Sequence, residues 1–307
     1  DVSEVDIRTS ILGLDIDMPI LIAPVAMQQM AHKDGETATA NAAKTLNTIM
    51  SHSTISNKSI NEIGPIHNKT FFQLYFSKDR NFTSEMLKNC KSLGYKGIVF
   101  TVDAPRLGTR ERDERNSFKM PSDLKLGNFV GTKFEHFDKI EEYDGSSMRV
   151  HSDHLFDPSL TFDIIPWIKE QSSLPVLVKG ILRPDDATQA LSYGADGIII
   201  SNHGGRQLDT VVPTLKQIEP IRNTIGYEPL IIVDGGIRRG TDILKCLALG
   251  ADAVQIGRPI LWGLQHEGQK GVELVLNMLK SELIETMILS GCKNLDEVTR
   301  DLVTKVY

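Results

Sequence analysis

The sequence has few cysteines, few aromatic residues and no long hydrophobic run. Its 307 residues include only Cys90, Cys246 and Cys292, and no two of these have the spacing of a metal or redox pair. We therefore expect reduced thiols and an intracellular protein. No apolar run reaches the roughly 20 residues that cross a bilayer, so no membrane segment is predicted.

The sequence also lacks an excess of one charge. The 34 Lys and Arg residues are interspersed with 40 Asp and Glu residues, for a net charge of -6. Proteins that bind nucleic acid usually carry a basic patch or stripe. Neither nucleic acid nor an anionic membrane is therefore an expected partner. A hydrophobic content of 40% and a charged content of 24% are typical of a globular enzyme.

Short apolar runs alternate with helix-prone segments along the chain. The runs are apolar without strict alternation, which predicts strands buried on both faces of a parallel sheet. Strands are expected at 19–26, 47–51, 71–76, 97–103, 175–179, 197–200, 229–234 and 251–256. Helices are expected at 36–46, 59–63, 81–93, 160–171, 184–193, 212–224, 241–249 and 261–289, the last interrupted near Gly268.

Eight strand–helix units predict an α/β protein with one domain over residues 1–307, a (β/α)8 TIM barrel. An open doubly wound sheet is the alternative, but no Gly-x-Gly-x-x-Gly follows a strand. Residues 104–159, after the fourth strand, form a long polar stretch that we expect to cover an active site. Because a strand pattern begins close to Asp1, we also expect that an N-terminal segment and the extreme C-terminus are missing.

Polar residues gather where the predicted strands end. Active sites of such barrels lie at the carboxyl ends of the strands. Any one of these residues could be structural, as a strand-end Asp that caps a helix is. Their collection at one rim favours a site that contains Ala26, Ser53, Gln73, Tyr75, Thr101, Asp103, Arg110, Lys179, Ser201, His203, Asp234 and Gly257.

The stretch Ser201–Asp209 reads Ser-Asn-His-Gly-Gly-Arg-Gln-Leu-Asp and follows a buried-strand pattern. It brings His203 and Arg206 into one turn, and two adjacent glycines let the backbone fold tightly there. A base beside a guanidinium that binds carboxylates suits chemistry on an α-substituted acid. Taken alone, the stretch is better explained as a polar surface turn, and the rest of the chain has to supply the argument for a site.

The ends of the seventh and eighth strands predict a phosphate site. Glycines at 235, 236 and 257 expose backbone N–H groups before a helix, and Arg238 and Arg258 add positive charge. A flat heterocycle attached to that phosphate could lie across Gln73, Thr101 and Lys179. Lys179 would then stabilise negative charge that grows on reduction of the ring. These features suggest flavin mononucleotide (FMN).

Five further motifs accompany Ser201–Asp209 in collinear order. They are Phe-Phe-Gln-Leu-Tyr (71–75), Thr-Val-Asp-Ala-Pro-Arg-Leu-Gly (101–108), Leu-Val-Lys-Gly (177–180), Asp-Gly-Gly-Ile-Arg-Arg-Gly (234–240) and Ile-Gly-Arg-Pro (256–259). Together the six motifs resemble the FMN-dependent α-hydroxy acid oxidase and dehydrogenase family, most closely its (S)-2-hydroxy acid oxidases, the glycolate oxidase group. The resemblance extends from the first residues to about Asp301.

The resemblance implies FMN as cofactor and oxidation of an (S)-2-hydroxy acid (glycolate, lactate or a longer aliphatic acid) to the 2-oxo acid, with O2 as acceptor and H2O2 as product. It implies His203 as the base, paired with Asp103, and Tyr75, Arg110 and Arg206 as substrate-binding residues. The residues that it implies for FMN are Ala26, Ser53, Gln73, Thr101 and Ser201 at the ring and ribityl chain, Lys179 at the N1/C2-carbonyl edge, and Asp234, Gly236, Arg238, Gly257 and Arg258 at the ribityl chain and phosphate.

The resemblance also implies a homotetramer and permits a peroxisomal location, although Lys305-Val306-Tyr307 is not a Ser-Lys-Leu signal. The chain departs from the family at two points. An upstream tyrosine that helps to bind the substrate carboxylate is absent, and Ile55 stands where glycolate-oxidising members often have tryptophan. The smaller side chain should widen the pocket and favour acids longer than glycolate.

Alternative functions remain open at this point. An FMN-dependent L-lactate dehydrogenase with another acceptor would share these motifs, although the absence of a haem-type segment favours an oxidase. An inactive FMN barrel that serves binding or assembly is a second alternative. An isomerase or nucleotide dehydrogenase on an FMN barrel is disfavoured by the pair His203 and Arg206. His151 and His154 have a metal-like spacing but no third ligand, so no metal site is predicted.

Overall fold

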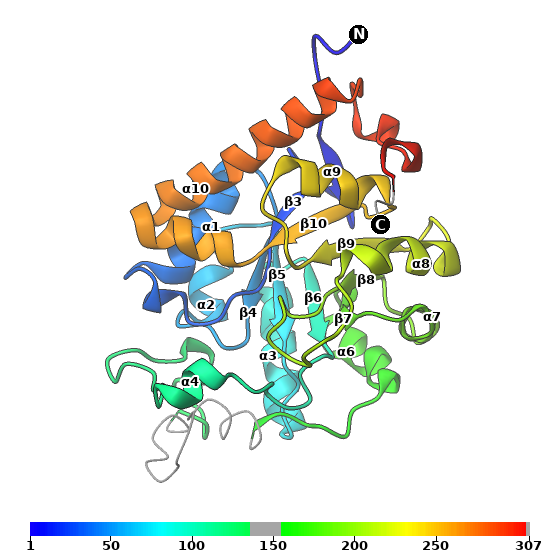
Figure 1. Ribbon diagram of the computed structural model, residues 1–307. Helices are drawn as coiled ribbons and strands as arrows, with labels where there is room; N and C mark the ends of the chain where they lie inside the picture. Colours follow the sequence, from blue (N-terminus) through cyan, green and yellow to red (C-terminus); the bar gives the residue numbers. More distant parts are fainter. Residues whose placement is uncertain (136–154, 305–307) are drawn as a thin grey trace.

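The computed structural model describes residues 1–135 and 155–304. Within them, eight parallel strands form a closed barrel in the order β10-β3-β4-β5-β6-β7-β8-β9 (Figure 1). The predicted (β/α)8 barrel is therefore confirmed. The strands are β3 Ile20–Ile22, β4 Met50–Ser53, β5 Thr70–Leu74, β6 Gly97–Thr101, β7 Val176–Ile181, β8 Gly197–Ile200, β9 Leu230–Asp234 and β10 Ala253–Ile256.

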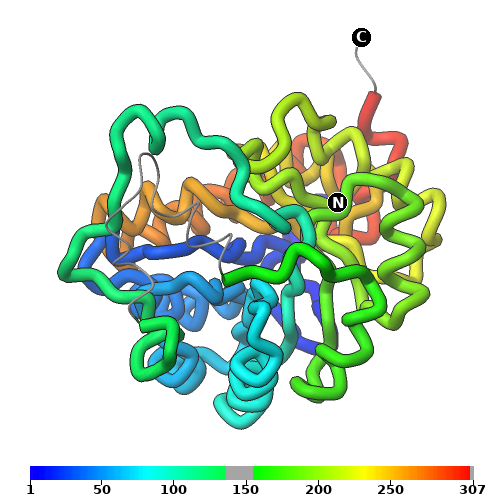
Figure 2. Tube along the Cα trace, turned by 90° about the horizontal axis from the view of Figure 1, so that it is seen from below, coloured from blue at the N-terminus to red at the C-terminus, as the bar shows by residue number. Residues whose placement is uncertain are grey.

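Helices follow the strands and surround the barrel (Figure 2). The predicted break in the last helix is confirmed, because Glu267 and Gly268 have non-helical backbone angles inside α10. The helices are α1 Gly35–Thr45, α2 Ile60–Ile63, α3 Arg80–Ser92, α4 Glu111–Arg115, α6 Ile165–Ser172, α7 Pro184–Ser192, α8 Leu215–Ile225, α9 Gly240–Ala248 and α10 Arg258–Leu289. Short 3-10 turns lie at η1 Gln28–Met30, η2 Gly127–Phe129, η4 Phe162–Ile164, η5 Leu295–Glu297 and η6 Arg300–Leu302.

Several strands differ at their ends from the prediction. The second barrel strand was expected at 47–51 and lies at Met50–Ser53. Asn47 adopts a left-handed backbone (φ 47°) and its N–H bonds the carbonyl of Lys44, so this residue closes the preceding helix instead of starting the strand. The strand expected at 19–26 ends at Ile22, and residues 23–27 form part of the rim of the barrel.

An antiparallel hairpin that the sequence analysis missed joins β1 (Thr9–Ile11) to β2 (Leu14–Ile16). Leu12 and Gly13 both have positive φ, as a two-residue hairpin turn of the primed type requires. Ile11 and Ile16 are buried, and they belong to the apolar cluster inside the barrel together with Leu21, Ile49, Phe71, Val99, Leu177, Ile199, Ile232 and Ala253. The hairpin therefore closes the core beneath the layer of polar side chains described below.

The described part of the stretch after β6 runs through α4 and η2, and Figure 1 shows it at the lower left of the strands. It is fastened to the barrel by two asparagines. Asn128 Nδ2 donates to the carbonyl of Thr54 at 3.0 Å, and Asn57 Nδ2 donates to the carbonyl of Lys125 at 2.9 Å. None of the described helices is long and apolar enough to cross a membrane.

Candidate active site

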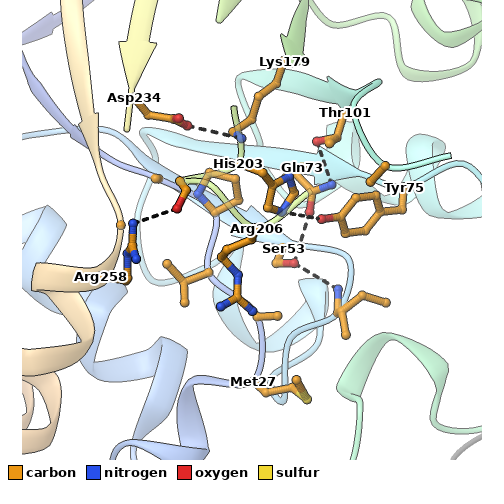
Figure 3. A pocket seen from close by; sticks show the side chains of 18 of the residues that line it. Met27, Ser53, Gln73, Tyr75, Thr101, Lys179, His203, Arg206, Asp234 and Arg258 are labelled. Atoms are coloured by element: carbon orange, nitrogen blue, oxygen red, sulfur yellow. Dashed lines mark hydrogen bonds and ion pairs between the residues drawn. The ribbon is translucent and has the colours of Figure 1, made fainter. Parts of the chain in front are cut away.

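A cavity of about 300 Å³ lies at the carboxyl ends of the barrel strands. Its volume is at the lower end of the range for small-molecule sites. Figure 3 shows side chains from several strands converging on it, with Arg206 between His203 and Met27. The predicted site residues that line it are Ala26, Ser53, Gln73, Tyr75, Thr101, Arg110, Lys179, His203, Arg206, Asp234, Gly236, Arg238, Gly257 and Arg258. Two do not line it, Asp103 and Ser201.

Asp103 lies behind His203 rather than on the cavity wall. Its Oδ1 is 3.0 Å from His203 Nδ1, and the other ring nitrogen, Nε2, is 3.4 Å from the hydroxyl of Tyr75. His203 has a left-handed backbone (φ 56°), and its N–H donates to Ser201 Oγ at 3.1 Å. These contacts hold the imidazole with one nitrogen on a carboxylate and the other toward the cavity, which is the arrangement of an oriented base.

The charged form of Asp103 is stabilised in spite of its burial. Burial raises the pKa of Asp103, but the hydrogen bond with His203 and the positive charge of Lys179 outweigh it, so that the pKa lies below the ordinary value. The carboxylate lies directly beside Gly180, where an added Cβ would come within 2.7 Å of Asp103 Cβ. Glycine at 180 is therefore needed for the close approach of β7 to this carboxylate.

Lys179 is part of a buried polar group in the barrel. Its Nζ donates to Ser201 Oγ at 2.8 Å and lies 3.2 Å from Asp234 Oδ2, while Ser201 Oγ donates to Asp234 Oδ1 at 2.7 Å. Burial lowers the pKa of Lys179, but the charges of Asp234 and Asp103 outweigh it, and the net pKa is raised. The ammonium is therefore a permanent positive charge at the cavity floor. The hydroxyl of Ser201 holds Lys179 and Asp234 in place, and its contact with the cofactor stays a prediction.

Amide and hydroxyl groups continue this polar floor on the neighbouring strands. Ser53 Oγ donates to Gln73 Oε1 at 3.1 Å, and Gln73 Nε2 donates to Thr101 Oγ1 at 3.0 Å (Figure 3). Gln73 has 1% of its surface exposed, so its rotamer is held on both sides. Together with Lys179, these groups offer fixed hydrogen-bond partners to a flat polar ring.

Two arginines mark one end of the cavity as an anion site. Burial and the positive charge of Arg258 both lower the pKa of Arg238, so the two guanidinium groups repel each other. The carbonyl of Gly204 accepts from Arg258 Nη2 at 2.8 Å, and Arg238 lies 5.1 Å from the centre of the Trp262 ring. An added Cβ at Gly236 would meet nothing within 4 Å. A phosphate between the arginines would relieve their repulsion.

A second pair of arginines lines the same cavity. Burial and the charge of Arg206 both lower the pKa of Arg110, and Arg110 Nε is buried with no partner among the described residues. Burial, together with the negative charge of Asp103, raises the pKa of Tyr75 to about 12, so its hydroxyl stays a donor. Two guanidinium groups and a phenol beside His203 form a second anion site, suited to a carboxylate.

Comparisons with known proteins agree with this geometry. The family model for FMN-dependent dehydrogenase matches residues 1–305. The chain belongs to the FMN-dependent dehydrogenase family. It is 46% identical to a 2-hydroxyacid oxidase of Dictyostelium discoideum over 306 residues, which are 99% of this chain and 77% of that protein. It is 44% identical to an L-lactate oxidase of Nostoc sp. over 303 residues, covering 97% and 82% of the two chains.

A solved structure in this family has the same fold. The structure of mandelate oxidase with (S)-4-hydroxymandelic acid superposes with a TM-score of 0.92 at 37% identity, covering 98% of this chain and 83% of that one. A Pediococcus acidilactici lactate oxidase structure gives a TM-score of 0.88 at 36% identity, covering 98% and 79%. The predicted family is thus confirmed.

FMN is the cofactor of this family, and the residues present fit it. The phosphate suits the cradle of Arg238 and Arg258, and the ring suits the floor of Gln73, Thr101 and Lys179. One buried acceptor on the floor, Gln255 Oε1, has no partner within the described residues, as expected where a ligand supplies the donor.

In the parts of the chain that the structure describes, no cluster of three His, Cys, Asp or Glu side chains could hold a metal ion. His151 and His154 lie outside the described residues.

Most of the residues in the outer wall of the cavity were not predicted from the sequence. This wall is apolar and consists of Ile55, Leu126, Phe129, Phe134, Leu155 and Phe156. Phe156 packs against the ring of Tyr75 with 4.8 Å between the ring centres. Ile55 lies just after β4. The other wall residues come from the polar stretch after β6, where isolated aromatic residues without periodicity indicated no common surface. Gln255 was also missed, although a glutamine inside a buried-strand pattern was a usable signal.

A buried carboxylate supports the rim of the cavity from behind. Glu36 is completely buried, and its Oε1 accepts the backbone N–H of Gln28 at 3.1 Å and of Asn57 at 3.0 Å. These two residues belong to the loops after β3 and β4. Burial raises the pKa of Glu36, and the backbone hydrogen bonds offset only part of this effect.

The raised pKa makes the contribution of Glu36 to stability depend on pH. Because the folded-state pKa lies above that of the unfolded chain, the favourable contribution is complete at low pH and is lost as the pH rises through the folded pKa. Glu36→Gln keeps the Oε1 acceptor and cannot ionise. We expect the free energy of unfolding of wild type to fall relative to that of the variant between pH 5 and pH 8, measured by urea titration. Parallel pH profiles would contradict the prediction.

Proposed function

We propose that this chain oxidises an (S)-2-hydroxy acid to the 2-oxo acid in the cavity between His203 and the arginine pair Arg110 and Arg206. The observation that carries the proposal is the imidazole held at 3.0 Å by Asp103 beside a carboxylate site and above a flavin floor. Bound FMN would supply the two-electron chemistry that side chains cannot, and O2 would then accept the two electrons and two protons as H2O2.

His203 is the proposed base. Its Nδ1 is held by Asp103, which leaves Nε2 to accept a proton from the C2 centre of the substrate, either from carbon or from its hydroxyl. The negative charge of Asp103 stabilises the imidazolium that forms. Such general-base assistance contributes about 10²- to 10⁴-fold to the rate.

Arg110, Arg206 and Tyr75 are the proposed substrate-binding residues. A guanidinium binds a carboxylate through two parallel hydrogen bonds, which orients the acid and discriminates against alcohols. The hydroxyl of Tyr75, 3.4 Å from His203 Nε2, can donate to the C2 oxygen of the substrate. These contacts would place C2 next to the base.

Lys179 and the remaining floor residues are the proposed FMN ligands. The ammonium of Lys179 is buried and held by Asp234 and Ser201, so no reorganisation is required when negative charge develops near it. Ala26, Ser53, Gln73, Thr101 and Ser201 are proposed along the ring and ribityl chain. Asp234, Gly236, Arg238, Gly257 and Arg258 are proposed at the ribityl chain and the phosphate.

Anaerobic reduction by substrate tests the proposed reaction. The FMN-loaded protein is mixed with L-lactate, with glycolate and with a longer 2-hydroxy acid in the absence of O2. We expect the flavin absorption to bleach and to return when O2 is admitted, with one H2O2 formed per 2-oxo acid. A flavin-loaded protein that none of these acids bleaches would contradict the proposal, and recovery with a different acceptor only would indicate a dehydrogenase.

The apolar wall supports a substrate with an apolar chain. Ile55 has 7% of its surface exposed and lines the cavity beside Phe129 and Leu155. A substrate chain in contact with this wall gains roughly 0.8 kcal/mol for each buried CH₂ group. We therefore propose acids longer than glycolate as the preferred substrates. Two relatives from Arabidopsis thaliana are named peroxisomal (S)-2-hydroxyacid oxidases, a name that specifies no chain length.

Replacing Ile55 by tryptophan should narrow the pocket at this wall. We expect Ile55→Trp to lower kcat/KM for a 2-hydroxy acid of six to eight carbons about 10- to 100-fold relative to glycolate, because the chain loses its apolar contacts and meets the larger ring. Steady-state kinetics with an aliphatic series measures the ratio. Ile55→Val, which removes one methyl group, serves as the matched control. Equal losses for all chain lengths would contradict a role in chain recognition.

From the family resemblance we also propose a homotetramer and a peroxisomal location. A homotetramer is supported by exposed apolar side chains along α10, among them Trp262, Leu274, Met278 and Leu289. A peroxisomal location is supported by the two peroxisomal relatives. Light scattering on the purified protein measures the mass of the assembly, and a monomer at micromolar concentration would contradict the first proposal.

A further inference from the structure

Gln255 on β10 has a side chain whose two polar ends differ in their partners. Nε2 donates to Ser51 Oγ on β4 at 3.2 Å, while Oε1 is buried and has no partner within the described residues. The residue is 1% exposed and lines the active-site cavity. Buried polar atoms in folded proteins are almost always paired, so an unpaired one on a cavity floor calls for a donor from the cavity.

The position of Gln255 in the barrel indicates which part of a ligand supplies that donor. Gln255 is in register with Asp234 on β9, and it precedes Gly257 and Arg258 of the phosphate cradle by two and three residues. The floor for the ring lies on β5, β6 and β7, at Gln73, Thr101 and Lys179. A molecule with its phosphate at the cradle and its ring over that floor must pass its connecting chain over the ends of β9 and β10.

The connecting chain of FMN is the ribityl group, which carries three hydroxyls. A hydroxyl both donates and accepts, so it satisfies the outer end of the Gln255 amide whichever way the amide is turned. The inner end keeps its bond to Ser51 in either orientation, since that hydroxyl has the same versatility. A ring carbonyl could satisfy only one of the two orientations.

We propose that Gln255 is a cofactor-binding residue that hydrogen-bonds one ribityl hydroxyl of FMN, with Ser51 holding the amide in place. Asp234 on the adjacent strand has both carboxylate oxygens engaged, one by Ser201 and the other by Lys179. Each of these oxygens can accept a further hydrogen bond from the ribityl chain, whereas Gln255 Oε1 has no partner at all within the described residues. The inference depends on FMN binding and not on which hydroxy acid is oxidised.

Flavin binding to the apoprotein tests the proposal without any substrate. FMN is titrated into apoprotein of wild type and of Gln255→Met, which has a similar volume and no amide, and quenching of flavin fluorescence gives the Kd. We expect the variant to bind FMN about 5- to 100-fold more weakly, the range for loss of one buried hydrogen bond. The same titration with 2′-, 3′- and 4′-deoxy-FMN identifies the hydroxyl, since one analogue should bind wild type and variant equally.

Stability of the apoprotein separates this role from a structural one. Because Oε1 has no partner before the ligand binds, Gln255→Met loses only the bond from Nε2 to Ser51, and it should lower the Tm of the apoprotein less than a variant that loses partners at both ends of its amide. Gln28 is the matched control. It is equally buried, but its Nε2 donates to the carbonyl of Val25 and its Oε1 accepts from Thr39, so Gln28→Met should lower the Tm.

Three results would overturn the proposal. The first is an FMN Kd within twofold of wild type in Gln255→Met, and the second is an equal loss with FMN and with every deoxy analogue. The third is a fall in the apoprotein Tm of both Gln255→Met and Gln255→Leu at least as large as that of Gln28→Met, which would assign the amide to the barrel itself. If Gln255→Met does not fold, Gln255→Leu provides the same comparison.

Discussion

Replacing His203 by glutamine is expected to lower kcat by about 10²- to 10⁴-fold while the protein still binds FMN. Glutamine can reach toward Asp103 with its amide, but it cannot accept a proton near neutral pH. The imidazole contacts Asp103 at 3.0 Å and Tyr75 at 3.4 Å, and it is not part of the Lys179–Ser201–Asp234 group that forms the floor. Turnover should therefore fail while the flavin site persists.

The measurement is stopped-flow reduction of the flavin by substrate, with the flavin content taken from the absorption spectrum. His266→Gln is the matched control, because His266 is exposed on α10 and away from the cavity, and its rate should equal that of wild type. A His203→Gln enzyme that reduces its flavin at a rate within tenfold of wild type would remove His203 from the role of base. Loss of flavin would show that the histidine holds the cofactor instead.

Arg206 lines the cavity with an exposed side chain. Replacing it by methionine is expected to lower kcat/KM by roughly 10²- to 10³-fold, because the substrate carboxylate would lose one partner of a charge-assisted pair that its binding buries. Arg110 remains, so binding of the carboxylate should weaken without being abolished. Because Arg206 lowers the pKa of Arg110, its removal also takes away a repulsion in the protein without substrate. The loss therefore measures the substrate contact rather than the folding of the site.

The design includes Arg206→Lys, which keeps the charge and loses the planar fork, and should recover only part of the loss. Arg183→Met, at an exposed arginine that pairs with Asp185 outside the cavity, is the matched control and should have no effect. The dissociation constant of a 2-oxo acid, from perturbation of the flavin spectrum, should rise in parallel. An unchanged constant would assign Arg206 to another role.

Much of this protein was readable from its residue pattern because the chemistry lies directly after the strands. The apolar runs of strand length predicted the eight strands of the barrel. Because these strands are parallel, the polar residues that follow them lie on the same rim. Tyr75, Lys179 and His203 were placed in this way and line the cavity together. The glycines at 235 and 236, both with positive φ, were likewise evident because few other residues adopt that backbone.

Contacts between residues far apart in the chain were decided only by the folded chain. The pairing of Asp103 with His203 spans 100 residues and followed from the family resemblance, not from any local pattern. The close approach that permits it depends on Gly180 of a third segment. Ser201 follows a strand like the other site residues, yet its hydroxyl lies between Lys179 and Asp234 rather than on the cavity wall. Strand order and side-chain direction determine such contacts, and neither is encoded in a local pattern.

The substrate end of the cavity shows the same division. Ile55 already indicated a wider pocket, because the family resemblance gave its position in the site and isoleucine is smaller than the tryptophan often found there. The wall around it is assembled from η2 and from residues 155 and 156, which packing alone brings together over the barrel. Gln255 was only partly predictable from the sequence. Its polarity within an apolar strand was visible in the sequence, but only the barrel shows that one end of its amide is bonded and the other is left for a ligand.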